Sequence, residues 1–157
     1  MTKKADLITK LHEVGVTYKR PVFDTMPHVV SPYDAYEVLK GIIDKKTIDH
    51  KEFFWLLLLT QSNRVIGYAE IGKGNTTGVA VNIKEIFQLA LMVNASGIII
   101  SHNHPSGNLK ASKSDIELTK TVKKAGKLFS ISLIDHLIVT SEYFISLSDE
   151  NLIIDDG

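Results

Sequence analysis

Two histidines one residue apart, His102 and His104, are the residues best suited by type and spacing to chemistry. They follow the apolar run at residues 97–100 and precede a turn rich in proline and glycine. Residues i and i+2 of an extended strand point to the same side, so the two imidazoles converge while Asn103 points away. Two histidines presented together at a strand end are a common starting point for a zinc site.

A third metal ligand is available shortly after the turn. Ser112 is placed to cap the next predicted helix, with Asp115 in its first turn. The Asp115 carboxylate could complete a site of two nitrogens and one oxygen, leaving a fourth position for water as in catalytic zinc sites. The same spacing is that of a capping box, and acidic residues are common at helix starts. The chain has no cysteine, so nitrogen and oxygen must supply any metal ligands.

The composition is that of an ordinary globular domain. The chain has 157 residues and a formal net charge of zero, which gives no general field to attract nucleic acid. Its first residues lack the apolar core of a signal peptide, and the most apolar run, Phe53 to Leu59, is too short to cross a bilayer. We therefore expect a cytoplasmic protein without membrane contact.

The elements expected to position these residues alternate between helix and strand. Helices are predicted over residues 31–48, 82–95 and 112–129, and strands over residues 51–61, 65–74, 97–100, 131–140 and 143–147. In the last helix the inward positions are predicted to be Ile116, Thr119, Val122 and Phe129. This order predicts an α/β domain with three α/β/α layers and a central mixed sheet. We assign residues 31–157 to it and residues 1–30 to an N-terminal extension, with one short helix near Lys3 to His12.

The motif resembles that of a known metalloprotease superfamily. His102, His104, Ser112 and Asp115 match the H-x-H-x7-S-x2-D signature of the JAMM (JAB/MPN-type) metalloproteases. Within this superfamily the segments SHNHPSG and LIDHLIVT resemble the RadC family of bacterial JAB-domain proteins, and the likeness runs over about residues 30–147. The resemblance implies a zinc-dependent peptide or isopeptide hydrolase, with a JAB/MPN-like fold related in architecture to the cytidine deaminases.

The resemblance also implies a role for each residue. His102, His104 and Asp115 would be the zinc ligands, and Ser112 would help to stabilise the oxyanion of a tetrahedral intermediate. The glutamate that hydrogen-bonds the zinc-bound water in the family is best matched by Glu52, with Glu70 as a competitor. A carboxylate there could take a proton from the water and pass it to a leaving amine.

Other residues leave alternatives open. Asp135 and His136 face opposite ways on a predicted strand, and one of them could orient a zinc histidine, or both could be a structural pair. A row of lysines shares one face of the predicted helix at residues 112–129, where a solvated surface is commoner than a nucleic-acid interface. The glycines at positions 72, 74 and 78 lack the lysine and hydroxyl residue of a phosphate-binding loop.

The functional hypotheses differ in what the site does. The first is the zinc hydrolase, acting on a protein or peptide. The second is a non-catalytic or weakly catalytic RadC-like protein associated with DNA repair through DNA or protein partners. Many RadC proteins carry an N-terminal helical DNA-binding region, but this chain has only about 30 residues there and no helix-hairpin-helix glycine pattern. The third is a binding module with structural zinc. A deaminase is excluded because it needs cysteine ligands, and a two-metal nuclease because the sequence has one cluster only.

Overall fold

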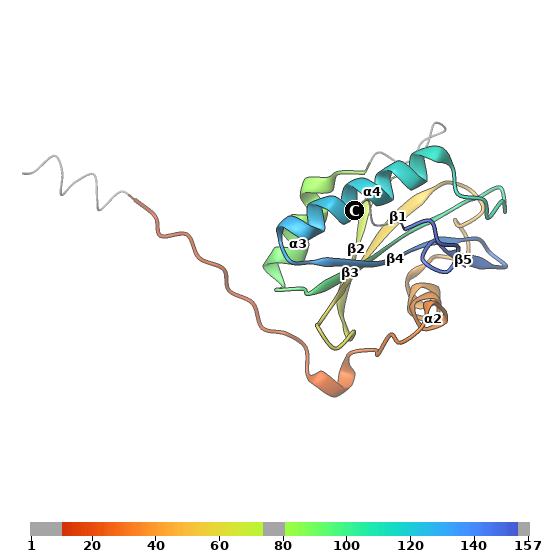
Figure 1. Cartoon of the computed structure of the whole chain (residues 1–157). Helices are drawn as coiled ribbons and strands as arrows, with labels where there is room; N and C mark the ends of the chain where they lie inside the picture. The colour runs from red at the N-terminus through yellow and green to blue at the C-terminus, as the bar shows by residue number, and fades with distance from the viewer. Residues whose placement is uncertain (1–10, 74–80, 154–157) are drawn as a thin grey trace, which may run out of the picture.

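A five-stranded mixed sheet forms the centre of the computed structural model, which describes residues 11–73 and 81–153 (Figure 1). Its strands, in the spatial order β2-β1-β3-β4-β5, are β1 (Phe53–Leu59), β2 (Val65–Lys73), β3 (Gly97–Asn103), β4 (Ser132–Val139) and β5 (Phe144–Ser146). The helices are α2 (Pro32–Ile42), α3 (Ile83–Met92) and α4 (Lys113–Leu128), with a short 3-10 turn η1 (Phe23–Thr25). Strands β3 and β4 are parallel, so α4 crosses over between them. The other strand pairs are antiparallel.

The sheet is buried on both faces. Alternate residues of β1 point to opposite sides, so Phe54, Leu56 and Leu58 pack under α3 and α4. Trp55, Leu57 and Leu59 pack with α2 on the other side. This is why β1 is an unbroken apolar run, as expected for a strand covered on both faces. The predicted α/β/α layering around a mixed sheet is confirmed (Figure 1).

Helix starts follow the sequence signals. Ser31 and Ser112 each form a capping box with an aspartate three residues on, and Asn82 caps α3. The prediction for Phe129 was wrong: α4 ends at Leu128, and Phe129 is 46% exposed. The buried position at this end is Gly126, where an added Cβ would collide with a backbone carbonyl oxygen at the approach to β4.

The N-terminal part of the chain is described from residue 11. Residues 11–22 run as exposed, extended backbone away from the sheet (Figure 1). The Phe23 ring lies 4.3 Å from the Arg64 guanidinium, and Met26 and Val29 are buried in the domain. Most of the short helix predicted near Lys3 to His12 lies outside the described residues, as do the glycines at positions 74 and 78. No helix within the described ranges is long and apolar enough to cross a membrane.

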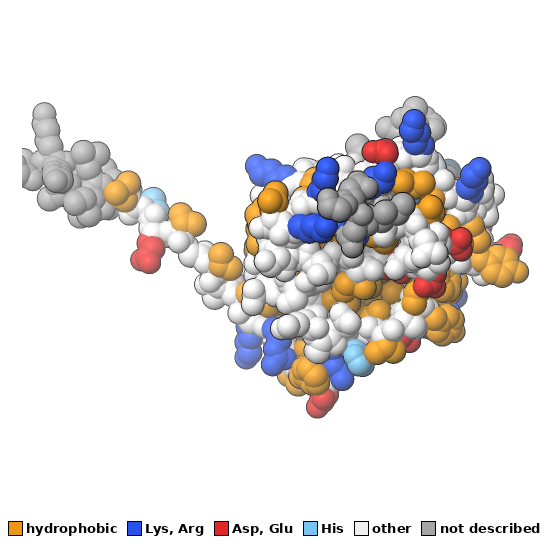
Figure 2. All heavy atoms as spheres, viewed as in Figure 1, with side chains coloured by type: hydrophobic (Ala, Val, Ile, Leu, Met, Phe, Trp, Pro, Cys, Tyr) orange, Lys and Arg blue, Asp and Glu red, His pale blue; other side chains and the backbone are white. Residues whose placement is uncertain are grey.

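The outer face of α4 carries the predicted row of lysines. Figure 2 shows basic side chains along the part of the surface where this helix runs. Lys120 lies 4.0 Å from a carboxylate oxygen of Glu117, and both Lys123 and Lys127 have interaction partners as well. These lysines therefore interact within the chain, and nucleic-acid binding by this face stays a prediction of the alternative function.

Candidate metal centre

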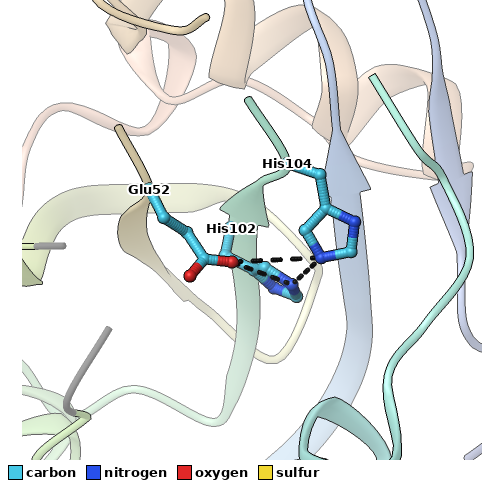
Figure 3. Close-up of side chains that lie close together, drawn as sticks. All are labelled: Glu52, His102 and His104. Atoms are coloured by element: carbon cyan, nitrogen blue, oxygen red, sulfur yellow. Dashed lines mark hydrogen bonds and ion pairs between the residues drawn. The ribbon is translucent and has the colours of Figure 1, made fainter. Parts of the chain in front are cut away.

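The two histidines lie where β3 ends. His102 is buried on β3, in register with Phe54 of β1 and Ile138 of β4. His104 follows the strand, and its backbone N–H donates to the carbonyl of Val139. The imidazoles point to the same side, as the alternation of a strand requires, and their Nε2 atoms are 2.9 Å apart (Figure 3).

Asp115 reaches the same point from the first turn of α4. Its Oδ1 lies 3.3 Å from Nε2 of His102, and its Oδ2 lies 3.4 Å from Nε2 of His104. The Ser112 N–H donates to Oδ2 at 2.8 Å and fixes the rotamer. Burial raises the pKa of the Asp115 carboxyl, but the close contacts with the His102 and His104 imidazoles outweigh this effect and hold the pKa well below its usual value. The Asp115 contact in turn raises the pKa of His104, against the opposing effect of burial.

These three side chains fit a divalent metal ion. Tetrahedral ligands at about 2.0–2.1 Å from zinc stand about 3.3 Å from one another. The Nε2–Nε2 distance of 2.9 Å and the two nitrogen–oxygen distances of 3.3 and 3.4 Å are close to that spacing. The His104 Nδ1–H donates to the carbonyl of Asn108 at 2.5 Å, which leaves the lone pair of Nε2 facing the other ligands.

Glu52 joins the cluster from the residue before β1. Its Oε1 is 3.9 Å from Nε2 of both histidines, and its side chain is 22% exposed (Figure 3). Ligand atoms of Glu52, His102 and His104 all lie within 4.8 Å of one another. Asp115 approaches both imidazoles more closely, so it is better placed as the third ligand. Glu52 is better placed beside an open position that a water could take. The competitor Glu70 is exposed on β2, opposite Trp55.

Asn103, between the two histidines, holds the segment that carries Glu52. Its side chain is fully buried on the opposite face of β3. Its Oδ1 accepts from the Phe53 N–H at 2.6 Å, and its Nδ2 donates to the carbonyls of Ile48 and Lys51 at 2.7 and 2.9 Å. The strand that presents the histidines therefore also fixes the backbone on both sides of Glu52.

Comparison with known proteins identifies the family. The sequence model of the RadC-like JAB domain matches residues 29–152, which is most of the chain. The chain belongs to the RadC-like JAB-domain family. Membership supports a relation to the JAMM superfamily, as the H-x-H-x7-S-x2-D motif predicted.

Relatives of this JAB domain are longer proteins. A UPF0758 protein of Flavobacterium johnsoniae is 36% identical over 149 residues, which are 95% of this chain and 64% of that protein. A UPF0758 protein of Coprothermobacter proteolyticus is 33% identical over 151 residues, again 64% of its length. One from Clostridium perfringens is 38% identical over 117 residues, 74% of this chain and 52% of that protein. The chain thus spans less than two thirds of the relatives it matches.

The JAB domain brings together four of the five predicted site residues. Glu52, His102, His104 and Asp115 converge as described above. Ser112 is exposed, and its Oγ accepts from the Asp115 N–H at 3.0 Å and lies 3.0 Å from Ser114 Oγ. Its capping role is therefore present in the structure, whereas its role at an oxyanion stays a prediction.

Two further buried residues lie behind His102. The Nδ1 atom of His102 is 2.8 Å from Nε2 of His136 on β4, and Nδ1 of His136 is 2.6 Å from Oγ1 of Thr119 on α4. The sequence left the role of His136 open and placed Thr119 only as an inward position. The parallel register of β3 and β4, which joins them, is not visible in the sequence. Asp135 faces the other way, where its carboxylate accepts from Ser146 and from two backbone N–H groups.

Proposed function

We propose that this JAB domain is a zinc-dependent hydrolase that cleaves a peptide or isopeptide bond. The observation that carries the proposal is the convergence of Nε2 of His102, Nε2 of His104 and the Asp115 carboxylate at distances of 2.9 to 3.4 Å. Two imidazoles and one carboxylate are a donor set used by catalytic zinc sites that keep one position open.

The roles of the residues follow from their positions. His102, His104 and Asp115 would hold the ion, which when bound lowers the pKa of water to about 7 and polarises a carbonyl oxygen. Glu52 would accept a proton at Oε1 from the water whose oxygen bonds to the substrate carbonyl carbon. As the carbon–nitrogen bond breaks, Glu52 would return that proton to the leaving amine. Ser112 is proposed to donate a hydrogen bond to the developing oxyanion.

The substrate class follows from the chemistry. The expected partner is a protein or peptide, because the superfamily's reaction acts on amide bonds and the chain has no cysteine for the related deaminase site. The flanking residues of the cleaved bond depend on the surface around the site. The relatives are longer than this chain. We extend the proposed hydrolase activity to whole proteins of this family as part of the same proposal.

The test compares Glu52→Gln with Glu70→Gln, both loaded with zinc. The probe is a pool of unmodified peptides and isopeptide-linked peptide pairs, read by mass spectrometry. We expect the wild type and Glu70→Gln to cleave members of the pool, and Glu52→Gln to be slower by about 100-fold or more while binding zinc normally. No cleavage by the zinc-loaded wild type would contradict the proposal. Equal rates for wild type and Glu52→Gln would contradict the role of Glu52.

A further inference from the structure

A chain of hydrogen bonds runs from His102 into the interior. His102 Nδ1 lies 2.8 Å from His136 Nε2, and His136 Nδ1 lies 2.6 Å from Thr119 Oγ1. The Thr119 hydroxyl also lies 2.7 Å from the backbone carbonyl oxygen of Asp115. His136 is fully buried and Thr119 is 1% exposed, so water does not compete for these bonds. The chain of hydrogen bonds links β3, β4 and α4, and the proposed hydrolysis does not itself use His136 or Thr119.

The donor and the acceptor of each hydrogen bond in this chain follow from the carbonyl oxygen of Asp115 at one end. A carbonyl oxygen only accepts, so the Thr119 hydroxyl uses its single proton to donate a hydrogen bond to the backbone carbonyl of Asp115. The Thr119 oxygen must then accept from His136, which places a proton on His136 Nδ1. The His136 ring is fully buried and its two nitrogens meet Thr119 and His102, neither of which is an acid that could balance a buried charge, so the ring is neutral and its Nε2 accepts. His102 therefore carries its proton on Nδ1 and has a bare Nε2.

We propose that Thr119 and His136 are positioning residues that hold His102 in the tautomer whose Nε2 can bind a metal. This inference rests on the proposed function, in which His102 is a zinc ligand. Two contacts of the Phe54 ring support it: the ring lies parallel to His102, with an interplanar angle of 9°, and meets His136 edge-on. Packing thus fixes the planes of the imidazoles, while the hydrogen-bond chain fixes their protons.

The opposite tautomer of His102, with the proton on Nε2, would be favoured by a hydrogen bond to Asp115. The hydrogen bonds of His136 and Thr119 are therefore needed to disfavour it. Asp115 Oδ1 lies 3.3 Å from His102 Nε2 and would accept a hydrogen bond if that nitrogen carried the proton. Such a proton must leave before a metal can bind, and this weakens the apparent affinity. Partners behind a metal-binding histidine typically change metal affinity by about 10- to 100-fold when they are removed.

The test removes the hydroxyl and keeps the shape. Thr119→Val lacks the group that accepts from His136, whereas Thr119→Ser keeps it. Thr121→Val is the matched control, because Thr121 also donates to a carbonyl one turn back, at 3.0 Å, but is exposed on the same helix. We expect zinc affinity, measured by chelator competition, to fall about 10- to 100-fold in Thr119→Val and to stay near wild type in the other two.

A second measurement is independent of turnover and of bound metal. Nitrogen NMR of the metal-free wild type distinguishes protonated from bare imidazole nitrogens, and we expect a protonated Nδ1 and a bare Nε2 on His102. In Thr119→Val the two tautomers should mix. Wild-type zinc affinity in Thr119→Val overturns the inference alone, whereas a wild type that binds no zinc contradicts the proposed function. If Thr119→Val does not fold, the wild-type spectrum decides, and a proton on His102 Nε2 overturns the inference.

Discussion

Replacing Asn103 by alanine should loosen the segment that carries Glu52. Asn103 is fully buried, and its side chain forms three hydrogen bonds to the backbone of residues 48–53, at 2.6, 2.7 and 2.9 Å. A buried hydrogen bond contributes about 1 kcal/mol net, so the variant should lose about 3 kcal/mol of unfolding free energy. The unfolding free energy of a native domain is typically about 5–15 kcal/mol, so the variant should still fold.

Ser101 is the matched control on the same strand face. It is also fully buried two residues earlier, and its Oγ has no hydrogen-bond partner among the described residues. Ser101→Ala should therefore change the unfolding free energy by no more than about 0.5 kcal/mol, or stabilise the protein, because no bond is lost. Urea unfolding of the metal-free proteins, followed by tryptophan fluorescence, measures both variants.

Zinc affinity adds a second readout to this comparison. Asn103→Ala leaves the side chains of the three proposed ligands in place, so zinc should bind within about threefold of wild type while peptide cleavage falls because Glu52 is displaced. Equal losses of stability in the two variants, or a loss below about 1 kcal/mol for Asn103→Ala, would refute the role given to these hydrogen bonds.

Three further predictions concern packing, pH and metal. Gly126→Ala should lower the unfolding free energy by about 1–3 kcal/mol, because the added Cβ would meet a backbone carbonyl. Gly41→Ala in α2, where an added Cβ has no atom within 4 Å, should raise the unfolding free energy by up to about 1 kcal/mol. Urea unfolding measures both changes. Several hydrogen bonds, the one from the Val30 N–H first among them, lower the pKa of the Asp34 carboxyl below its ordinary value of 3.8. Its stabilising effect is therefore full above that pH and is lost as the pH falls through the lower pKa of the folded state. The difference in unfolding free energy between wild type and Asp34→Asn should accordingly shrink as the pH of the urea titrations is lowered below 3.8. Zinc at 100 times its dissociation constant should raise the unfolding free energy of the wild type by about 2.7 kcal/mol. The same zinc concentration should leave the unfolding free energy of His104→Ala unchanged.

Local spacing carries most of what the sequence predicted. His102 and His104 converge because a strand alternates, and Asp115 meets them because a capped helix begins after a short turn. The burial of β1 on both faces follows from its unbroken apolar run. Glu52 is a different case, since it lies 50 residues before His102. Its assignment came from the family resemblance, and the structure places it beside both imidazoles.

Features that depend on register and on helix ends were not predictable in the same way. His136 meets His102 because parallel pairing brings β4 beside β3, and Thr119 meets both through the crossing of α4. The side chain of Asn103 was expected only to point away from the histidines. Its hydrogen bonds to the backbone of residues 48–53 could not be predicted, because they depend on the three-dimensional path of that segment. Phe129 was placed inward because helical periodicity was extended one residue past the end of α4.

Elemental mass spectrometry measures directly whether the site at His102, His104 and Asp115 holds zinc. The purified protein is compared with His104→Ala and Asp115→Ala after all three are supplied with zinc. We expect about one zinc per chain in the wild type and loss of the metal in both variants. A wild type that holds no metal would contradict the proposed metal site, as would variants that keep theirs.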